Sequence, residues 1–162
     1  MATPKGFLLT FRTYGTWLHG DERGSVDTER NCPGTPLIAP AEHWRNWQQA
    51  RLAYPPMVFD AVMRACVNQA IHEECMFRCW GLVQVNVRTN HAHVVLLASD
   101  TTPERMLGHL KSRSTRMLRR QGLATVHQPV WADGVGSRRY LWTDEHLRTA
   151  EAYVREGQDT PR

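Results

Sequence analysis

The sequence predicts an α+β fold, a ferredoxin-like antiparallel sheet with helices on one face plus a C-terminal helix. The prediction depends on three observations: apolar residues alternate over residues 6–14, two strand-like runs meet at a tight turn within residues 79–99, and other stretches repeat apolar residues every three or four positions. With 162 residues, 41% of them hydrophobic, the chain is long enough for one core, so we expect a single domain over residues 1–162.

Each remaining element is predicted from its periodicity and its end signals. They are a strand at 6–14, a short helix at 41–53, a long helix at 56–77, a helix at 103–121, a strand near 138–143 and a last helix at 144–157. Gly122 should end the helix at 103–121. Thr143 or Asp144 should cap the last helix, and Gly157 should end it.

The hairpin at residues 79–99 is the most informative stretch. With a turn at Thr89 and Asn90, His91 lies opposite Arg88 and His93 opposite Asn86, so these side chains share one face with Gln84. The other face contains only apolar residues and should pack on the helices: Val83, Val85, Val87, Ala92, Val94 and Leu96. We therefore expect both histidines on the open face of the sheet.

The His-x-His spacing of His91 and His93 suits a metal site. Alternate residues of a strand point to the same side about 7 Å apart, close enough for two imidazoles to share one divalent ion. The alternative is a pair of surface or hydrogen-bonded histidines, because the pattern is short. The apolar face opposite favours the metal site, since these histidines are not needed for packing.

Net charge and cysteine content limit the classes of partner and the cellular location that we expect. The net charge of +4 is modest, but residues 105–120 contain six basic residues and no acidic one, which favours an anionic partner. The cysteines, Cys32, Cys66, Cys75 and Cys79, are expected to be reduced thiols, although Cys75 and Cys79 with His72 leave a zinc site as an alternative. Without a signal-peptide pattern or a membrane-length apolar run, we expect a cytoplasmic protein.

Tyr153, in AEAYVREGQ on the last predicted helix, is the second chemical candidate. A helical tyrosine is usually a core residue with its hydroxyl at the rim. A phenol of pKa about 10 is a poor nucleophile at neutral pH unless a metal or a basic group stabilises the phenolate. A metal at the two histidines would supply that stabilisation.

The motifs NHAHVVLL, LKSRSTRML, VWADGVGSRRYLW and AEAYVREGQ, in this order, resemble the single-tyrosine HUH transposases. This is the insertion-sequence-200-like family, which includes the REP-associated tyrosine transposases, and the opening TFRTYGTWLHGDERGSVD resembles it too. The resemblance implies that His91 and His93 bind a catalytic Mg²⁺ or Mn²⁺ and that Tyr153 is the nucleophile. Where the family commonly has an amide-type third ligand, four residues after the tyrosine, this chain has Gly157, so we favour the neighbouring Gln158.

The resemblance also implies a reaction and its partners. Tyr153 would cleave single-stranded DNA, at a hairpin-containing element end or repeat, through a 5′-phosphotyrosine intermediate that allows strand transfer. Family members are typically homodimers. Lys111, Arg113 and Arg116 would bind backbone phosphates, and Trp17, Trp131 or Trp142 would stack bases.

Other interpretations stay open. An RNA-recognition domain shares the order of elements, but this hairpin has Gln84, Asn86, His91 and His93 where that domain would place aromatic residues. A catalytically silent or domesticated relative would bind single-stranded nucleic acid without cleaving it. Tyr140 is the rival nucleophile, although RRYLWT places it on a strand.

Overall fold

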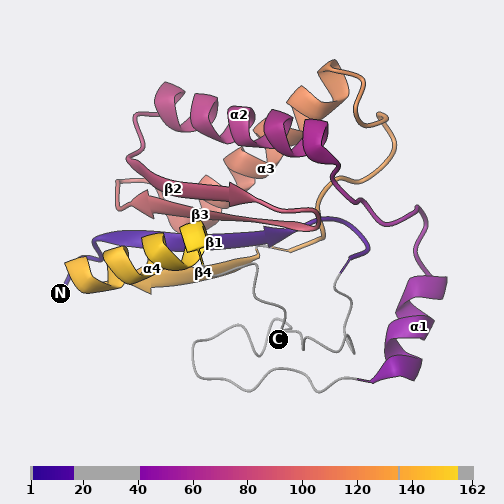
Figure 1. Cartoon of the computed structure of the whole chain (residues 1–162), viewed down its shortest axis with the longest axis horizontal. Coiled ribbons are helices and arrows are strands. Elements are labelled where there is room, and N and C mark those ends of the chain that lie inside the picture. Colours follow the sequence, from indigo (N-terminus) through magenta and orange to yellow (C-terminus); the bar gives the residue numbers. More distant parts are fainter. Residues whose placement is uncertain (1, 17–40, 135, 157–162) are drawn as a thin grey trace.

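Four antiparallel strands form one sheet with helices on both of its faces. The computed structural model describes residues 2–16, 41–134 and 136–156. Its elements are β1 (Gly6–Arg12), α1 (Glu42–Ala50), α2 (Ala61–Phe77), β2 (Leu82–Val87), β3 (His91–Leu97), α3 (Pro103–Arg120), β4 (Ser137–Leu141) and α4 (Asp144–Glu156). The strand order is β2-β3-β1-β4, with α2 and α3 on one face and α4 on the other (Figure 1). The predicted α+β class is confirmed.

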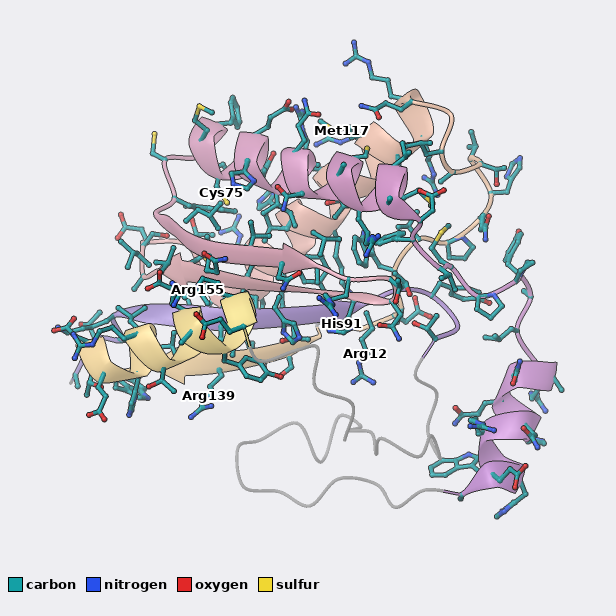
Figure 2. The ribbon with its side chains drawn as sticks, viewed as in Figure 1. Arg12, Cys75, His91, Met117, Arg139 and Arg155 are labelled. Carbon is teal, nitrogen blue, oxygen red and sulfur yellow. The ribbon has the colours of Figure 1, made fainter. Side chains whose placement is uncertain are left out.

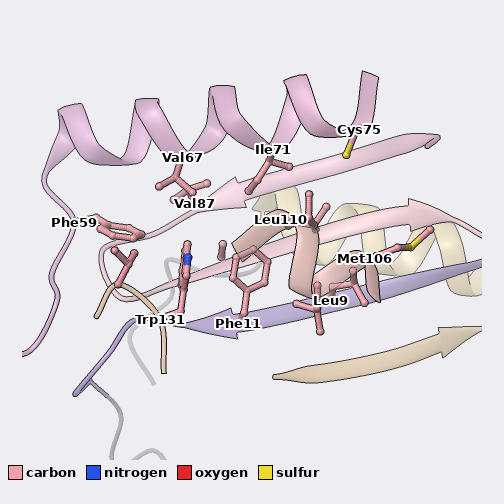
Figure 3. Packing of buried hydrophobic residues seen from close by; sticks show 14 of the residues in the cluster. Leu9, Phe11, Phe59, Val67, Ile71, Cys75, Val87, Met106, Leu110 and Trp131 are labelled. Carbon is pink, nitrogen blue, oxygen red and sulfur yellow. The ribbon is translucent and has the colours of Figure 1, made fainter. Parts of the chain in front are cut away.

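The main core lies between the sheet and the pair α2 and α3. Because β1 alternates, Leu9 and Phe11 point to this side, where Figure 3 shows them below Val67 and Ile71 of α2 and beside Leu110 of α3. All five side chains are fully buried. Burial of each large apolar side chain contributes about 1.5–3 kcal/mol, so this face holds the sheet and the two long helices together.

The long helix starts later than its periodicity predicts, at Ala61 and not at residue 56. Asp60 is its N-cap and accepts a hydrogen bond from the Met63 backbone N–H at 2.8 Å. The preceding residues bond elsewhere: the Met57 N–H donates to the Tyr14 carbonyl and the Phe59 N–H to the Thr89 carbonyl. These long-range bonds hold residues 57–59 against the sheet, which local periodicity cannot reveal.

The hairpin register is as predicted at the histidines, with Asn86 paired to His93 and Gln84 to Val95. Val83, however, does not lie on the predicted apolar face. A bulge between Leu82 and Gln84 shifts the alternation, so Leu82 packs on the main core and Val83 packs on the opposite face.

A second, smaller core holds α4 against the other face. Val95, Leu141, Ala150 and Val154 are buried there, with Leu8, Val83 and Leu147 packed around them. Thr143 begins the helix as predicted, since its hydroxyl accepts from the His146 backbone N–H at 3.1 Å. The histidine face is thus partly covered by α4 and not open along its whole length.

Candidate active site

His91 and His93 lie side by side on the sheet face that α4 covers. They are two residues apart on β3, so both point away from the main core, and their ring centroids are 4.7 Å apart. Figure 2 shows His91 at the end of the sheet toward which α4 runs. The predicted orientation of the pair, on the face of Asn86 and away from α2 and α3, is confirmed.

Each imidazole is held through its Nδ1 atom. His91 Nδ1 lies 2.7 Å from Asn90 Oδ1, and His93 Nδ1 lies 2.7 Å from Thr10 Oγ1. Both oxygens can accept a hydrogen bond, and an Nδ1–H donor leaves the lone pair of a neutral imidazole on Nε2. This arrangement of a histidine bonded through one ring nitrogen and ligating through the other is usual at metal sites.

His93 is the more enclosed of the two rings and is only 7% exposed. Burial, together with the neighbouring positive groups His91 and Arg88, lowers its pKa to about 3. The ring is therefore neutral at physiological pH, which is the form that binds a metal.

Tyr153 projects from α4 onto the His93 ring. The two ring centroids are 5.7 Å apart in an edge-on arrangement, and the tyrosine remains 47% exposed. Asn86 fixes this part of the helix, because its Nδ2 donates to the Val154 carbonyl at 2.9 Å. A phenol that is both accessible and next to the histidine pair has the position that a nucleophile needs.

Tyr140, the rival nucleophile, lies on the opposite face of the sheet. Its ring packs edge-on against Phe7 at 5.3 Å, and Phe7 belongs to the main core. Its other aromatic neighbour is Trp142, stacked at 5.9 Å. The sheet therefore separates Tyr140 from both histidines.

The predicted DNA-contacting residues are on α3, behind the sheet as seen from Tyr153. Arg113 pairs with Glu73 of α2 at 2.6 Å, and this bond lowers the pKa of the Glu73 carboxyl. Lys111 donates to the carbonyls of Ala132 and Gly134, and burial lowers its pKa. Arg116 is exposed. The structure thus brings His91, His93 and Tyr153 together and leaves the basic residues of α3 apart from them.

The remaining candidates are the third metal ligand, the tryptophans and the alternative zinc ligands. Gln158, Gly157 and Trp17 lie outside the described residues, and Trp131 is buried with its indole N–H donating to the Lys111 carbonyl. For the zinc alternative, Cys75 is buried, Cys79 is exposed and His72 Nδ1 lies 2.9 Å from the Asn68 carbonyl. Within residues 2–16, 41–134 and 136–156, no group of three or more His, Cys, Asp or Glu side chains could hold a metal ion.

Three candidate functional residues are not identified as such from the sequence: Thr10, Asn86 and Asn90. From the sequence, the two asparagines are named only for the pairing and the turn of the hairpin. Asn90 directly precedes His91 and could have been noticed as a side chain able to reach its ring. Thr10 is 83 residues from His93, and only the pairing of β1 with β3 brings them together. No local sequence pattern predicts the contact between Thr10 and His93.

Comparison with known families agrees with this geometry. In the described part of the chain, no helix is both long and apolar enough to cross a membrane. No curated protein matches the chain. The family described as transposase IS200-like matches residues 51–157, which is more than half of the chain and includes the histidine pair, the basic helix and Tyr153. Such a family implies a transposase that processes DNA. The chain belongs to the transposase IS200-like family.

Proposed function

We propose that this protein is a metal-dependent single-strand DNA endonuclease and strand transferase in which Tyr153 is the nucleophile. The observation that carries the proposal is the contact between Tyr153 and His93 on a face where both imidazoles are held through Nδ1. Family membership supplies the class of substrate, DNA, and the class of reaction, transposition.

His91 and His93 fit a divalent metal, since both can present Nε2 as a ligand. Imidazole nitrogens alone are a sparse donor set for Mg²⁺ or Mn²⁺, which prefer oxygen, so we expect a third ligand with an oxygen donor, and Gln158, which lies outside the described residues, is our candidate. When bound, the ion would supply Lewis-acid stabilisation of negative charge on the scissile phosphate.

The chain's own residues account for the cleavage step. The Tyr153 oxygen attacks the phosphorus in line, its phenolic proton passes to solvent, and the bond from phosphorus to the 3′ oxygen breaks. The leaving oxygen takes a proton and becomes a 3′-hydroxyl, while the 5′ end stays attached as a phosphotyrosine. Attack by another 3′-hydroxyl reverses the step and joins two strands without a nucleotide cofactor.

Positioning of the substrate belongs to other residues. We infer that Lys111, Arg113 and Arg116 contact phosphates of the DNA outside the reacting centre, as their location on α3 suggests. The protein is proposed to act as a homodimer on a hairpin-containing element end or repeat.

An adduct assay tests the proposal. The full chain with Mg²⁺ or Mn²⁺ is incubated with labelled single-stranded oligonucleotides that tile the DNA on both sides of the gene, then denatured and separated on a gel. We expect a denaturation-resistant band that Tyr153→Phe and His91→Ala abolish and that Tyr140→Phe, the matched control, retains. A wild-type protein that binds an oligonucleotide but never forms the band would favour a silent binding module of the same fold.

A further inference from the structure

A pocket opens between α4 and the sheet beside Tyr153. Its volume is about 460 Å³, within the range that holds small-molecule ligands. Tyr153 and His93 line one end of it, so the pocket continues from the candidate active site. We call it the α4 pocket.

The floor of the α4 pocket is apolar. Leu8 of β1, Leu141 of β4 and Ala150 of α4 line it, and the last two are almost completely buried. A flat aromatic ring would gain dispersion and hydrophobic contact on such a surface, whereas a sugar-phosphate backbone would not.

Its polar groups come from one face of α4, which includes the Glu145 carboxylate, from Thr10 on β1 and His93 on β3, and from the edge strand β4. His146, Thr149 and Tyr153 are three or four residues apart, so they follow one another along the helix and all line the pocket. His146 Nδ1 accepts from the Trp142 backbone N–H, so the neutral ring carries its proton on Nε2 as a donor. Arg139 adds a positive charge from β4, where Figure 2 shows it near α4.

An apolar floor, several hydrogen-bonding groups and one charge of each sign, Arg139 and Glu145, match the chemistry of an unstacked base, whose edge offers both donors and acceptors. We propose that the α4 pocket holds the base of one unpaired nucleotide directly beside the scissile phosphate. The inference depends on the proposed function, because it places this base next to the phosphate that Tyr153 attacks. The bound base fixes where the strand is cut.

The test uses a variant that fills the pocket. Thr149 is exposed, so Thr149→Trp places an indole in the α4 pocket at small cost to the fold, and Arg148→Trp puts the same side chain on the neighbouring position, which does not line the pocket. The nucleotide attached to the protein is first mapped by sequencing the adduct. Each position around the cut is then replaced by an abasic residue.

We expect one abasic position beside the cut to lower wild-type adduct formation about tenfold, the order of magnitude that one stacked base contributes to binding. Thr149→Trp should reduce adduct formation by a similar factor on the intact oligonucleotide and cause no further reduction on the oligonucleotide that is abasic at that position. Arg148→Trp should behave as wild type on both.

Two results contradict the inference, and they are distinguishable. If the wild type forms the adduct but no abasic position and no Thr149→Trp substitution changes its rate, the α4 pocket holds no base and the proposed function stands. If no oligonucleotide yields an adduct, the proposed function fails, and the inference fails with it.

Discussion

At the scale of single residues, the hydrogen bonds behind the two imidazoles decide which nitrogen faces the site. Thr10 and Asn90 each place an oxygen 2.7 Å from an Nδ1 atom. Such outer contacts orient a histidine ligand and select its tautomer. His93 is the more dependent of the two, because its ring is buried and an Nδ1–H donor without a partner would be costly there.

Thr10→Val should therefore weaken metal binding without unfolding the protein. The substitution keeps the β-branched shape on β1 but removes the oxygen that faces His93 Nδ1. We expect the Mn²⁺ concentration for half-maximal adduct formation to rise about 10- to 100-fold, as it does for other changes to the groups that orient a histidine ligand. Thr10→Ser, which keeps the oxygen, should stay near wild type. An unchanged midpoint for Thr10→Val would show that this bond does not position the ring.

The histidine pair can be singled out from its spacing of two on a strand, whereas Tyr153 is singled out by the resemblance of AEAYVREGQ to the family's terminal motif. Thr10 could not be chosen in that way. Its role depends on the register between β1 and β3, and that register follows from the packing of the whole sheet.

At the scale of elements, the two long helices end in the same way with different residues. After α3, the Gly122 N–H donates to the Arg119 carbonyl and the Leu123 N–H to the Leu118 carbonyl, with Gly122 at φ +72°. This is a Schellman motif, whose left-handed residue is usually glycine. After α2, Cys79 takes that position at φ +56°.

Cys79→Gly should stabilise the protein. Glycine adopts positive φ without the steric cost that a Cβ atom brings, and we expect the free energy of unfolding to rise by about 0.5–1 kcal/mol. Urea denaturation measures this change. Cys79→Ala removes the same thiol but keeps the Cβ atom, so it should give no gain. Equal stabilisation by both variants would assign the effect to the thiol.

Sequence patterns located every helix and strand that the structure describes but misplaced details that depend on distant contacts. Asp60 starts α2 because the residues before it bond to Tyr14 and Thr89. The bulge after Leu82 moves Val83 to the other face because the edge strand adds a residue against β3. Neither the start of α2 nor the bulge in β2 can be recognised from the spacing of apolar residues in the sequence.

At the scale of the whole molecule, the sheet separates the two sets of residues to which we assign proposed functions. Tyr153 and the histidine pair occupy the face under α4, while Lys111, Arg113 and Arg116 belong to the helix layer on the other face (Figure 1). If both contact one DNA molecule, the strand must pass around the edge of the sheet. The basic helix should then contribute to affinity more than to the chemical step.

Replacing Arg113 and Arg116 by Ala together should weaken single-strand binding and reduce its salt dependence. For single strands, the slope of log affinity against log salt falls by about 0.7 for every phosphate that the protein no longer neutralises. Fluorescence anisotropy across a salt series measures both quantities. Arg64→Ala, which removes a charge from α2, is the control. Affinity and slope that match those of the control would show that the DNA does not follow α3.

From the sequence we expect the histidine face to be open, whereas α4 covers part of it. Leu8, Val95 and Leu141 give the histidine side of the sheet an apolar patch, and a helix with an apolar stripe is the natural cover for it. The residues of this patch come from three different strands, however. The patch can therefore be recognised only once the strand order β3-β1-β4 is known. The sequence therefore indicated the polar neighbours of the histidines and not the cover above them.

The central claim, that Tyr153 forms a covalent link to DNA, is tested most directly by locating the link. Trypsin would place Tyr153 in the peptide of residues 149–155 and Tyr140 in that of residues 140–148, so mass spectrometry of the nuclease-trimmed adduct separates the two. We predict the mass of a 5′-phosphorylated nucleotide on peptide 149–155, on Tyr153. The same mass on peptide 140–148, or on no peptide of a complex that binds DNA, would contradict the account.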